Sequence, residues 1–217
     1  MATTGTYTAR DLITDAYRKV GIVAEDEAMT ADQAATGVRE MNRMLKGWQN
    51  KGVNLWAKAS QTLTLTTAAS YSLNPVRPIR ILSARFTRSG IETPIQEMTR
   101  DEYDRLPVKT STGQPTSFHY DRQREAALFY VWPVLAVASG ETVKITYERE
   151  FDDQTDLDTV PDVPGEWWDA LLYNLADRLQ DNHPGIDNPK VTARAGALLD
   201  DALAGDREGS IFFGGLS

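Results

Sequence analysis

The chain has 217 residues, of which 41% are hydrophobic and 25% charged, so it can bury a core without disulfides or metals. It contains no cysteine, which excludes a disulfide-stapled scaffold, thiol chemistry and thiolate metal sites. The net charge of −8 is concentrated in residues 151–217, where fourteen acidic residues outnumber four basic ones, and this argues against ordinary nucleic-acid binding.

The N-terminal segment, residues 1–58, has the pattern of two helices. It lacks the basic and apolar stretches of a signal peptide, and no apolar run in the chain approaches the roughly 18 residues of a membrane span. We therefore expect synthesis in the cytoplasm and no membrane partner. Thr8 and Asp11 form a capping pattern ahead of an apolar stripe, and Gly21 supplies a C-cap. Thr30 opens a second helix whose apolar positions recur every three or four residues, as in a helix that packs on another helix.

Residues 59–151 change to the alternating pattern of strands. Leu63 and Leu65 alternate with threonines, and Val143 and Ile145 alternate with polar residues in the same way. One short helix, RDEYDRLP, interrupts the strands. Because most strands are short and joined by short turns, we predict an antiparallel sheet.

Residues 152–206 begin with an acidic linker, DDQTDLDTVPDVPGE, and continue with two amphipathic helices. The linker lacks the glycine of an EF-hand loop, so we interpret it as solvated chain. The helices at both ends of the chain each need an apolar partner. The simplest arrangement is an α+β fold in which the N- and C-terminal helices form one bundle, with a small antiparallel β domain, residues 59–151, inserted between them.

The last segment, residues 207–217, is apolar and too short to bury its own side chains. Chain ends are usually polar and loose, but this one carries Ile211, Phe212, Phe213 and Leu216. We interpret it as a docking tail whose four apolar side chains bind a neighbouring subunit or another protein. The alternative is that it folds back on the chain's own helices.

Four tryptophans are candidates for a subunit interface: Trp48, Trp56, Trp167 and Trp168. The side chains of Trp167 and Trp168, which are adjacent in the sequence, point about 100° apart on a helix, so they cannot both face one core. Burial in the chain's own core is the alternative for each of them.

The sequence contains no recognisable catalytic, metal-binding or cofactor-binding motif. His119 falls in a predicted strand and His183 in a turn, and neither is spaced with carboxylates as metal ligands are. Glu102 and Glu166 each lie beside aromatic residues, which leaves hydrolysis of a cell-wall glycan by paired carboxylates open as an alternative function. A free-standing soluble binding module is a third possibility.

Two stretches resemble the head-to-tail adaptor proteins of short-tailed phages, also called tail accessory factors or packaged-DNA stabilisation proteins. The first is a helix that ends in LKGWQNKGVNLW and leads directly into QTLTLTTAASYSL. The second is the helix EWWDALLYNLADRL, which follows a strand that ends in ITYERE. The resemblance spans nearly the whole chain and rests on patterns of helix, aromatic residue and strand.

The resemblance implies a structural protein of the virion neck, with neither enzymatic activity nor a cofactor. Such adaptors form a ring, typically of twelve copies, that binds the portal protein, extends the DNA channel, helps to retain packaged DNA and seats the tail nozzle or tail fibres. Their fold is a helical bundle that carries a small β domain. In some relatives a C-terminal segment reaches the portal, and residues 207–217 occupy that position here.

An acidic wall would let DNA slide through such a ring without sequence-specific binding, because DNA is itself a polyanion. We therefore expect four linker residues to line the channel: Asp152, Asp153, Asp156 and Asp158.

Overall fold

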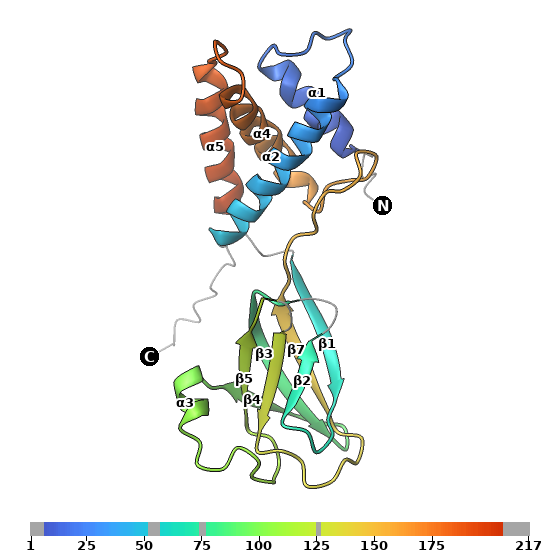
Figure 1. Ribbon diagram of the computed structural model, residues 1–217, viewed down its shortest axis with the longest axis vertical. Helices are drawn as coiled ribbons and strands as arrows, with labels where there is room; N and C mark the ends of the chain where they lie inside the picture. Colours follow the sequence, from blue (N-terminus) through green and yellow to red (C-terminus); the bar gives the residue numbers. More distant parts are fainter. Residues whose placement is uncertain (1–6, 52–56, 74–76, 125–126, 206–217) are drawn as a thin grey trace, which may run out of the picture. The chain divides into compact units, whose positions relative to one another are not determined.

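The computed structural model describes residues 7–51, 57–73, 77–124 and 127–205. The fold is α+β, as predicted, with five α-helices and one nearly closed seven-stranded sheet in the described part of the chain. Contacts divide the chain into two compact units, and Figure 1 labels most of their elements. The helical unit consists of Met1–Trp56 and Phe151–Ser217, and the β unit of Ala57–Glu150. None of the described helices is both long and apolar enough to cross a bilayer.

Helices α1 (Ala9–Lys19) and α2 (Ala31–Asn50) begin where the sequence predicts them, each at a capping box. In α1, the Thr8 hydroxyl accepts a hydrogen bond from the backbone N–H of Asp11, and the Asp11 carboxylate accepts bonds from the hydroxyl and backbone N–H of Thr8. The bonds that the carboxylate accepts lower the pKa of Asp11, because they stabilise its charged form. After α1, Gly21 has a φ of +74°, the left-handed conformation expected at a helix end.

Helix α4 (Trp168–Asp181) is the centre of the helical unit, since it packs against α1, α2 and α5 (Pro189–Gly205). A single 3-10 turn, Gly165–Trp167, leads into it. Its central position explains why α4 carries so many buried apolar side chains: Ala170, Leu171, Leu175, Ala176 and Leu179. Helix α5 is buried mainly in its first half, at Val191 and Ala195.

Helices α1 and α2 approach each other closely at Gly37. A Cβ atom built there would overlap Cγ2 of Ile13 and lie 3.3 Å from its Cβ. Ile13 is fully buried, and its branched side chain has few other rotamers, so it cannot move away. The glycine is therefore required by packing, although glycine lowers helix stability.

This contact predicts opposite effects for two glycines of the same helix. Gly37→Ala should lower the free energy of unfolding by about 1–2 kcal/mol, because overpacking outweighs the gain in helix propensity. Gly47→Ala is the control, since a Cβ there meets only Nη2 of Arg178 at 3.9 Å. It should raise stability by about 0.5–1 kcal/mol. Urea unfolding followed by circular dichroism measures both, and equal stabilisation by the two alanines would contradict the close approach at Gly37.

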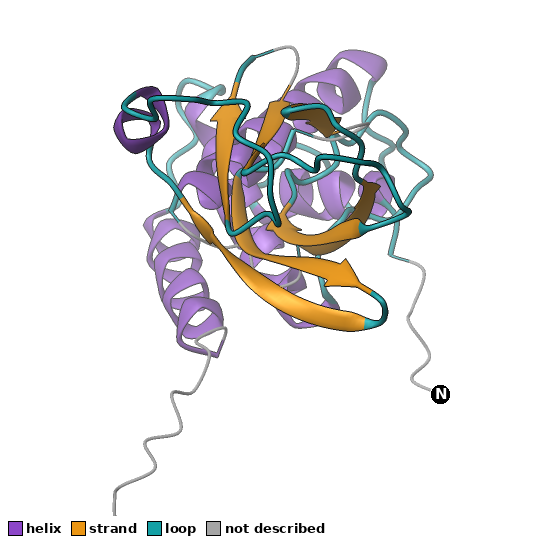
Figure 2. Cartoon of the chain, turned by 90° about the horizontal axis from the view of Figure 1, so that it is seen from below, coloured by secondary structure: helices purple, strands orange, loops and turns teal. Residues whose placement is uncertain are grey.

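The seven strands of the β unit are β1 (Lys58–Thr64), β2 (Ser70–Leu73), β3 (Arg80–Arg88), β4 (Ile91–Glu97), β5 (Ser117–Arg122), β6 (Ala127–Trp132) and β7 (Thr142–Glu148). They are hydrogen-bonded in the order β1-β7-β3-β4-β5-β6-β2. The two edge strands, β1 and β2, are consecutive in the chain and joined by residues 65–69, so the sheet must curve until its edges approach. Seen from below, the strands wrap around a common interior (Figure 2).

The prediction of a purely antiparallel sheet is wrong at one pair, because β4 and β5 are parallel. Gln96 of β4 lies beside Ser117 of β5. Parallel neighbours need a crossover of about a dozen residues or more. Residues 98–116, which include the short helix α3 (Arg100–Asp104), provide that crossover.

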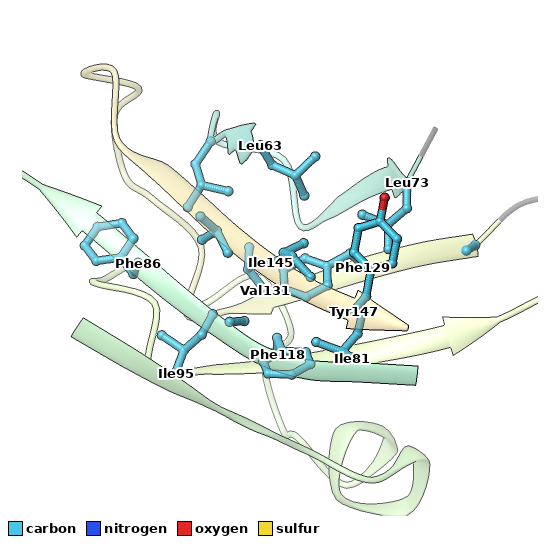
Figure 3. Packing of buried hydrophobic residues seen from close by; sticks show 14 of the residues in the cluster. Leu63, Leu73, Ile81, Phe86, Ile95, Phe118, Phe129, Val131, Ile145 and Tyr147 are labelled. Atoms are coloured by element: carbon cyan, nitrogen blue, oxygen red, sulfur yellow. The ribbon is translucent and has the colours of Figure 1, made fainter. Parts of the chain in front are cut away.

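The interior of the β unit is filled by apolar side chains from every strand. In Figure 3 these side chains point toward one another, with Phe118 and Phe129 among the residues at the centre. Their rings stack with centroids 4.9 Å apart. The alternation seen in the sequence thus places one side of each strand in the core. The labelled core residues are Leu63, Leu73, Ile81, Phe86, Ile95, Phe118, Phe129, Val131, Ile145 and Tyr147.

Candidate functional site

Residues 151–163 form an extended segment that lies along the helical unit, and we call it the acidic strap. The backbone N–H of Ala9 donates to the carbonyl of Thr159 (2.9 Å), and that of Arg10 donates to the carbonyl of Leu157 (2.8 Å). The first N–H groups of a helix have no partner inside the helix, so the strap satisfies two of these donors in α1. The backbone of the acidic strap is therefore fixed to α1, while most of its aspartate side chains stay exposed.

A second set of contacts fixes the acidic strap to α2. The side-chain amide of Asn42 donates to the carbonyl of Gln154 (2.9 Å) and accepts from its backbone N–H (2.8 Å). Lys46 Nζ donates to the carbonyl of Phe151 (2.7 Å). Gln154 and Phe151 are themselves buried, at 6% and 1% exposure. The strap is thus an integral part of the helical unit's surface.

Asn42 offers a specific test of this attachment. Asn42→Ala removes two hydrogen bonds and leaves a buried carbonyl and N–H of Gln154 without that partner, at a cost of about 1–2 kcal/mol. We expect amide hydrogen exchange in residues 152–160 to become about tenfold faster while α4 remains protected. Arg43→Ala, an exposed position on the same helix, is the control and should leave exchange unchanged. Equal protection of the strap in both variants would contradict this role for Asn42.

All four predicted channel aspartates lie in the acidic strap, with exposed or solvent-facing carboxylates. Asp158 Oδ1 accepts from Arg10 Nε (2.9 Å), and Asp153 forms an ion pair with Lys46 (3.3 Å). Asp156 accepts from the backbone N–H of Asp158 (3.0 Å), and the backbone N–H of Asp152 donates to Asp162 (3.2 Å). Exposed ion pairs contribute little to stability, so these carboxylates mainly set the charge of the surface.

The candidate interface tryptophans are mostly part of the chain's own core. Trp48 and Trp167 are 3% and 1% exposed, with ring centroids 5.5 Å apart, so they present no surface to a neighbour. Trp168 is half-buried, donates to the carbonyl of Val163 (3.3 Å) and stacks on Tyr7 at 5.4 Å. Trp56 lies outside the described residues.

A cleft opens between the start of α4 and the end of α5, with a volume of about 330 Å³. We call it the α4–α5 cleft. It is lined by Glu166, Trp167, Asp169, Ala170, Leu198, Asp201, Ala202 and Gly205. The predicted docking residues Ile211, Phe212, Phe213 and Leu216 lie outside the described residues, but the chain that leads to them leaves from the edge of this cleft at Gly205.

The side chains that the sequence offers as catalytic or metal-binding candidates make contacts that stabilise the fold. His119 is buried, its Nδ1 donates to the carbonyl of Met98 (3.1 Å), and its ring stacks on Tyr103 at 5.2 Å. Glu102 belongs to the capping box of α3, where hydrogen bonds from Thr99 lower its pKa, the opposite of what a general acid needs. His183 Nδ1 lies 3.0 Å from the carbonyl of Leu179. In the described ranges, no three His, Asp or Glu residues are grouped to hold a metal ion.

The residues that attach the acidic strap had no signal in the sequence. Arg10, Asn42 and Lys46 look like ordinary polar residues of amphipathic helices, and Gln154 looks like a linker residue. Their contacts join positions more than a hundred residues apart. Only the three-dimensional structure shows that they act together.

Comparison with known proteins gives one informative match. The model of the SU10 adaptor protein family matches residues 7–211, which include both units. No curated protein matches the chain. Among solved structures, it is similar to a chain from the neck of an empty GTA particle, with 13% identity, 81% of each chain covered and a TM-score of 0.30. A TM-score of 0.30 means that the two chains superpose poorly, so the family of this chain is assigned from the family model alone.

Proposed function

Because the chain belongs to the SU10 adaptor protein family, we propose that it is a structural head-to-tail adaptor in the neck of a phage particle. In this role it forms a ring under the portal, extends the DNA channel, helps to retain packaged DNA and seats the tail nozzle. The observation that supports the proposal is the family match over residues 7–211, nearly the full length of the chain. In this role the chain acts by binding other proteins of the particle through its surfaces, without a reaction centre.

The division into two units suits such an adaptor. We take the helical unit to be the bundle that forms the body of the ring and the β unit to be an insertion carried by it. The two links between the units are residues 52–56 and the junction at Glu150, and the backbone N–H of Arg149 donates to the carbonyl of Ala57 (2.7 Å). The β unit therefore begins and ends at one place, so its insertion disturbs the helical unit little.

A ring needs two different complementary surfaces on each subunit. One candidate is a groove of about 670 Å³ between α2, the start of α1 and the acidic strap. Its floor is apolar, formed by residues that include Met29, Ala34, Val38 and Leu157. We assign this groove to the neighbouring subunit of the ring, in which about twelve copies are expected.

The acidic strap supports an electrostatic role toward DNA. Asp152, Asp153, Asp156 and Asp158 keep their carboxylates at the surface of the helical unit. We propose that they line the channel, where like charge prevents DNA from adhering during ejection. A bore lined mainly by arginine and lysine in the assembled ring would refute this assignment.

The decisive experiment is electron cryo-microscopy of the purified chain mixed with the portal protein of the same phage. We expect a ring of this chain seated on the portal, with the acidic strap facing the channel. The chain alone is not a sufficient test, because such adaptors can stay monomeric until they meet the portal. Portal rings that carry no density for this chain at micromolar concentration would overturn the proposal.

A further inference from the structure

The α4–α5 cleft leaves apolar surface uncovered at the end of the helical unit. Helix α5 is covered at Val191 and Ala195, but Leu198, Leu199 and Leu203 in its second half are only half-buried. Leu198 and Ala202 line the cleft on one side. Trp167 and Ala170 line the other side but are only 1% and 2% exposed, so α5 supplies the open apolar surface. A cleft of about 330 Å³ is at the small end of the range for binding sites, which suits one or two apolar side chains.

The rim of the α4–α5 cleft is acidic. Glu166, Asp169 and Asp201 all line it and are exposed. Within the described ranges, none of the three forms an ion pair with a lysine or arginine. The cleft therefore favours an occupant that combines large apolar side chains with a positive charge.

The chain itself continues into a segment rich in large apolar side chains, in which Arg207 stands between two acids, Asp206 and Glu208, so the apolar side chains and not the net charge match the cleft. Gly205 lines the cleft, and twelve residues follow it, with Arg207 as their single basic residue. Residues 206–210 separate Gly205 from the apolar run Ile211, Phe212 and Phe213. At about 3.5 Å per residue, this spacer can reach roughly 20 Å, enough to turn back into a cleft that begins at Gly205.

We propose that the α4–α5 cleft binds the C-terminal segment of the same chain, residues 206–217. An aromatic side chain of that segment covers the Leu198 and Ala202 surface, and Arg207 pairs with the acidic rim. A short tether raises the effective concentration of the segment to the millimolar range, which favours this chain's own tail over that of another copy. While residues 206–217 occupy the cleft, they cannot bind another protein until that protein displaces them.

The absence of cysteine allows a direct cross-linking test. The double variant Asp169→Cys with Gly214→Cys places one thiol on the rim of the cleft and one in the tail. The matched control, Asp181→Cys with Gly214→Cys, also removes an exposed acid of α4, but about 18 Å farther along the helix. Mild oxidation followed by a non-reducing gel and peptide mass analysis separates bridges within a chain from bridges between chains.

We expect the 169–214 bridge to form within one chain at least about tenfold faster than the 181–214 bridge. Adding Ala202→Phe, which fills the cleft, or replacing Phe212 and Phe213 with serine should reduce the rate to that of the control. Equal rates for the two cysteine pairs would overturn the proposal. So would a product that consists mainly of bridged dimers, since it would assign the cleft to the tail of another copy.

This cross-link tests the cleft, and the portal-binding experiment tests the neck function. The cleft proposal rests on the helical unit alone, so failure of either experiment leaves the other result intact.

Discussion

Replacing Trp167 with alanine should lower the free energy of unfolding of the helical unit by about 3–5 kcal/mol, as expected for a buried tryptophan. Trp167 is 1% exposed, lies immediately before α4 and packs its ring against Trp48. Its removal would leave a cavity where α2 and the start of α4 meet. A loss of this size approaches the total stability of many small domains.

The measurement must resolve the two units, because they are separate compact bodies. Hydrogen exchange read peptide by peptide in increasing urea does this. We expect α4 to lose protection at lower urea in Trp167→Ala, while β7 and β3 of the β unit keep theirs. Phe129→Ala, which removes a fully buried ring from the β unit, is the matched control and should show the converse pattern. A loss of less than about 1 kcal/mol would mean that Trp167 contributes little to the core.

Deletion of residues 209–217 should abolish binding of the chain to the portal while leaving both units folded. Each buried aromatic or large aliphatic anchor contributes on the order of 2 kcal/mol, and the deletion removes four of them. Loss of even two anchors corresponds to at least about a hundredfold weaker binding per subunit. Repetition around a ring amplifies the difference.

Surface plasmon resonance on immobilised portal, with circular dichroism to check folding, measures the effect. The full-length variant in which Ile211, Phe212, Phe213 and Leu216 are changed to serine should match the deletion. A truncation of Ser217 alone is the control and should bind normally. Unchanged binding by the deletion would place the portal contact on the body of the chain instead.

Local signals in the sequence predicted the helices well. The capping boxes at Thr8 and Thr30 mark the starts of α1 and α2, because a short polar side chain followed three residues later by an acid or amide satisfies helix donors locally. Residues that determine the packing between helices were less visible. Gly37 looks like an unfavourable helix residue until Ile13 is seen against it.

The features that the sequence does not reveal share a physical cause: they depend on contacts between residues that are far apart in the chain. The parallel pairing of β4 with β5 depends on where residues 98–116 return the chain, and no local pattern encodes that. The attachment of the acidic strap has no local signal either, because its partners Asn42 and Lys46 lie more than a hundred residues away. The sequence leaves the tryptophans open between a subunit interface and the chain's own core, and only the packing shows that Trp48 and Trp167 face inward.

The position of the β unit in the middle of the chain also sets an order of events during synthesis. Residues 57–150 contain every strand of the sheet, so the β unit can fold as soon as its last residue has left the ribosome. Helices α1 and α2 are made first, yet α4, against which both pack, emerges later. At about 5–20 residues per second, their apolar faces wait several seconds or longer for α4. Helices α1 and α2 are thus the first to be translated, yet their apolar faces stay uncovered longest. Chaperones can bind the nascent chain there during that time.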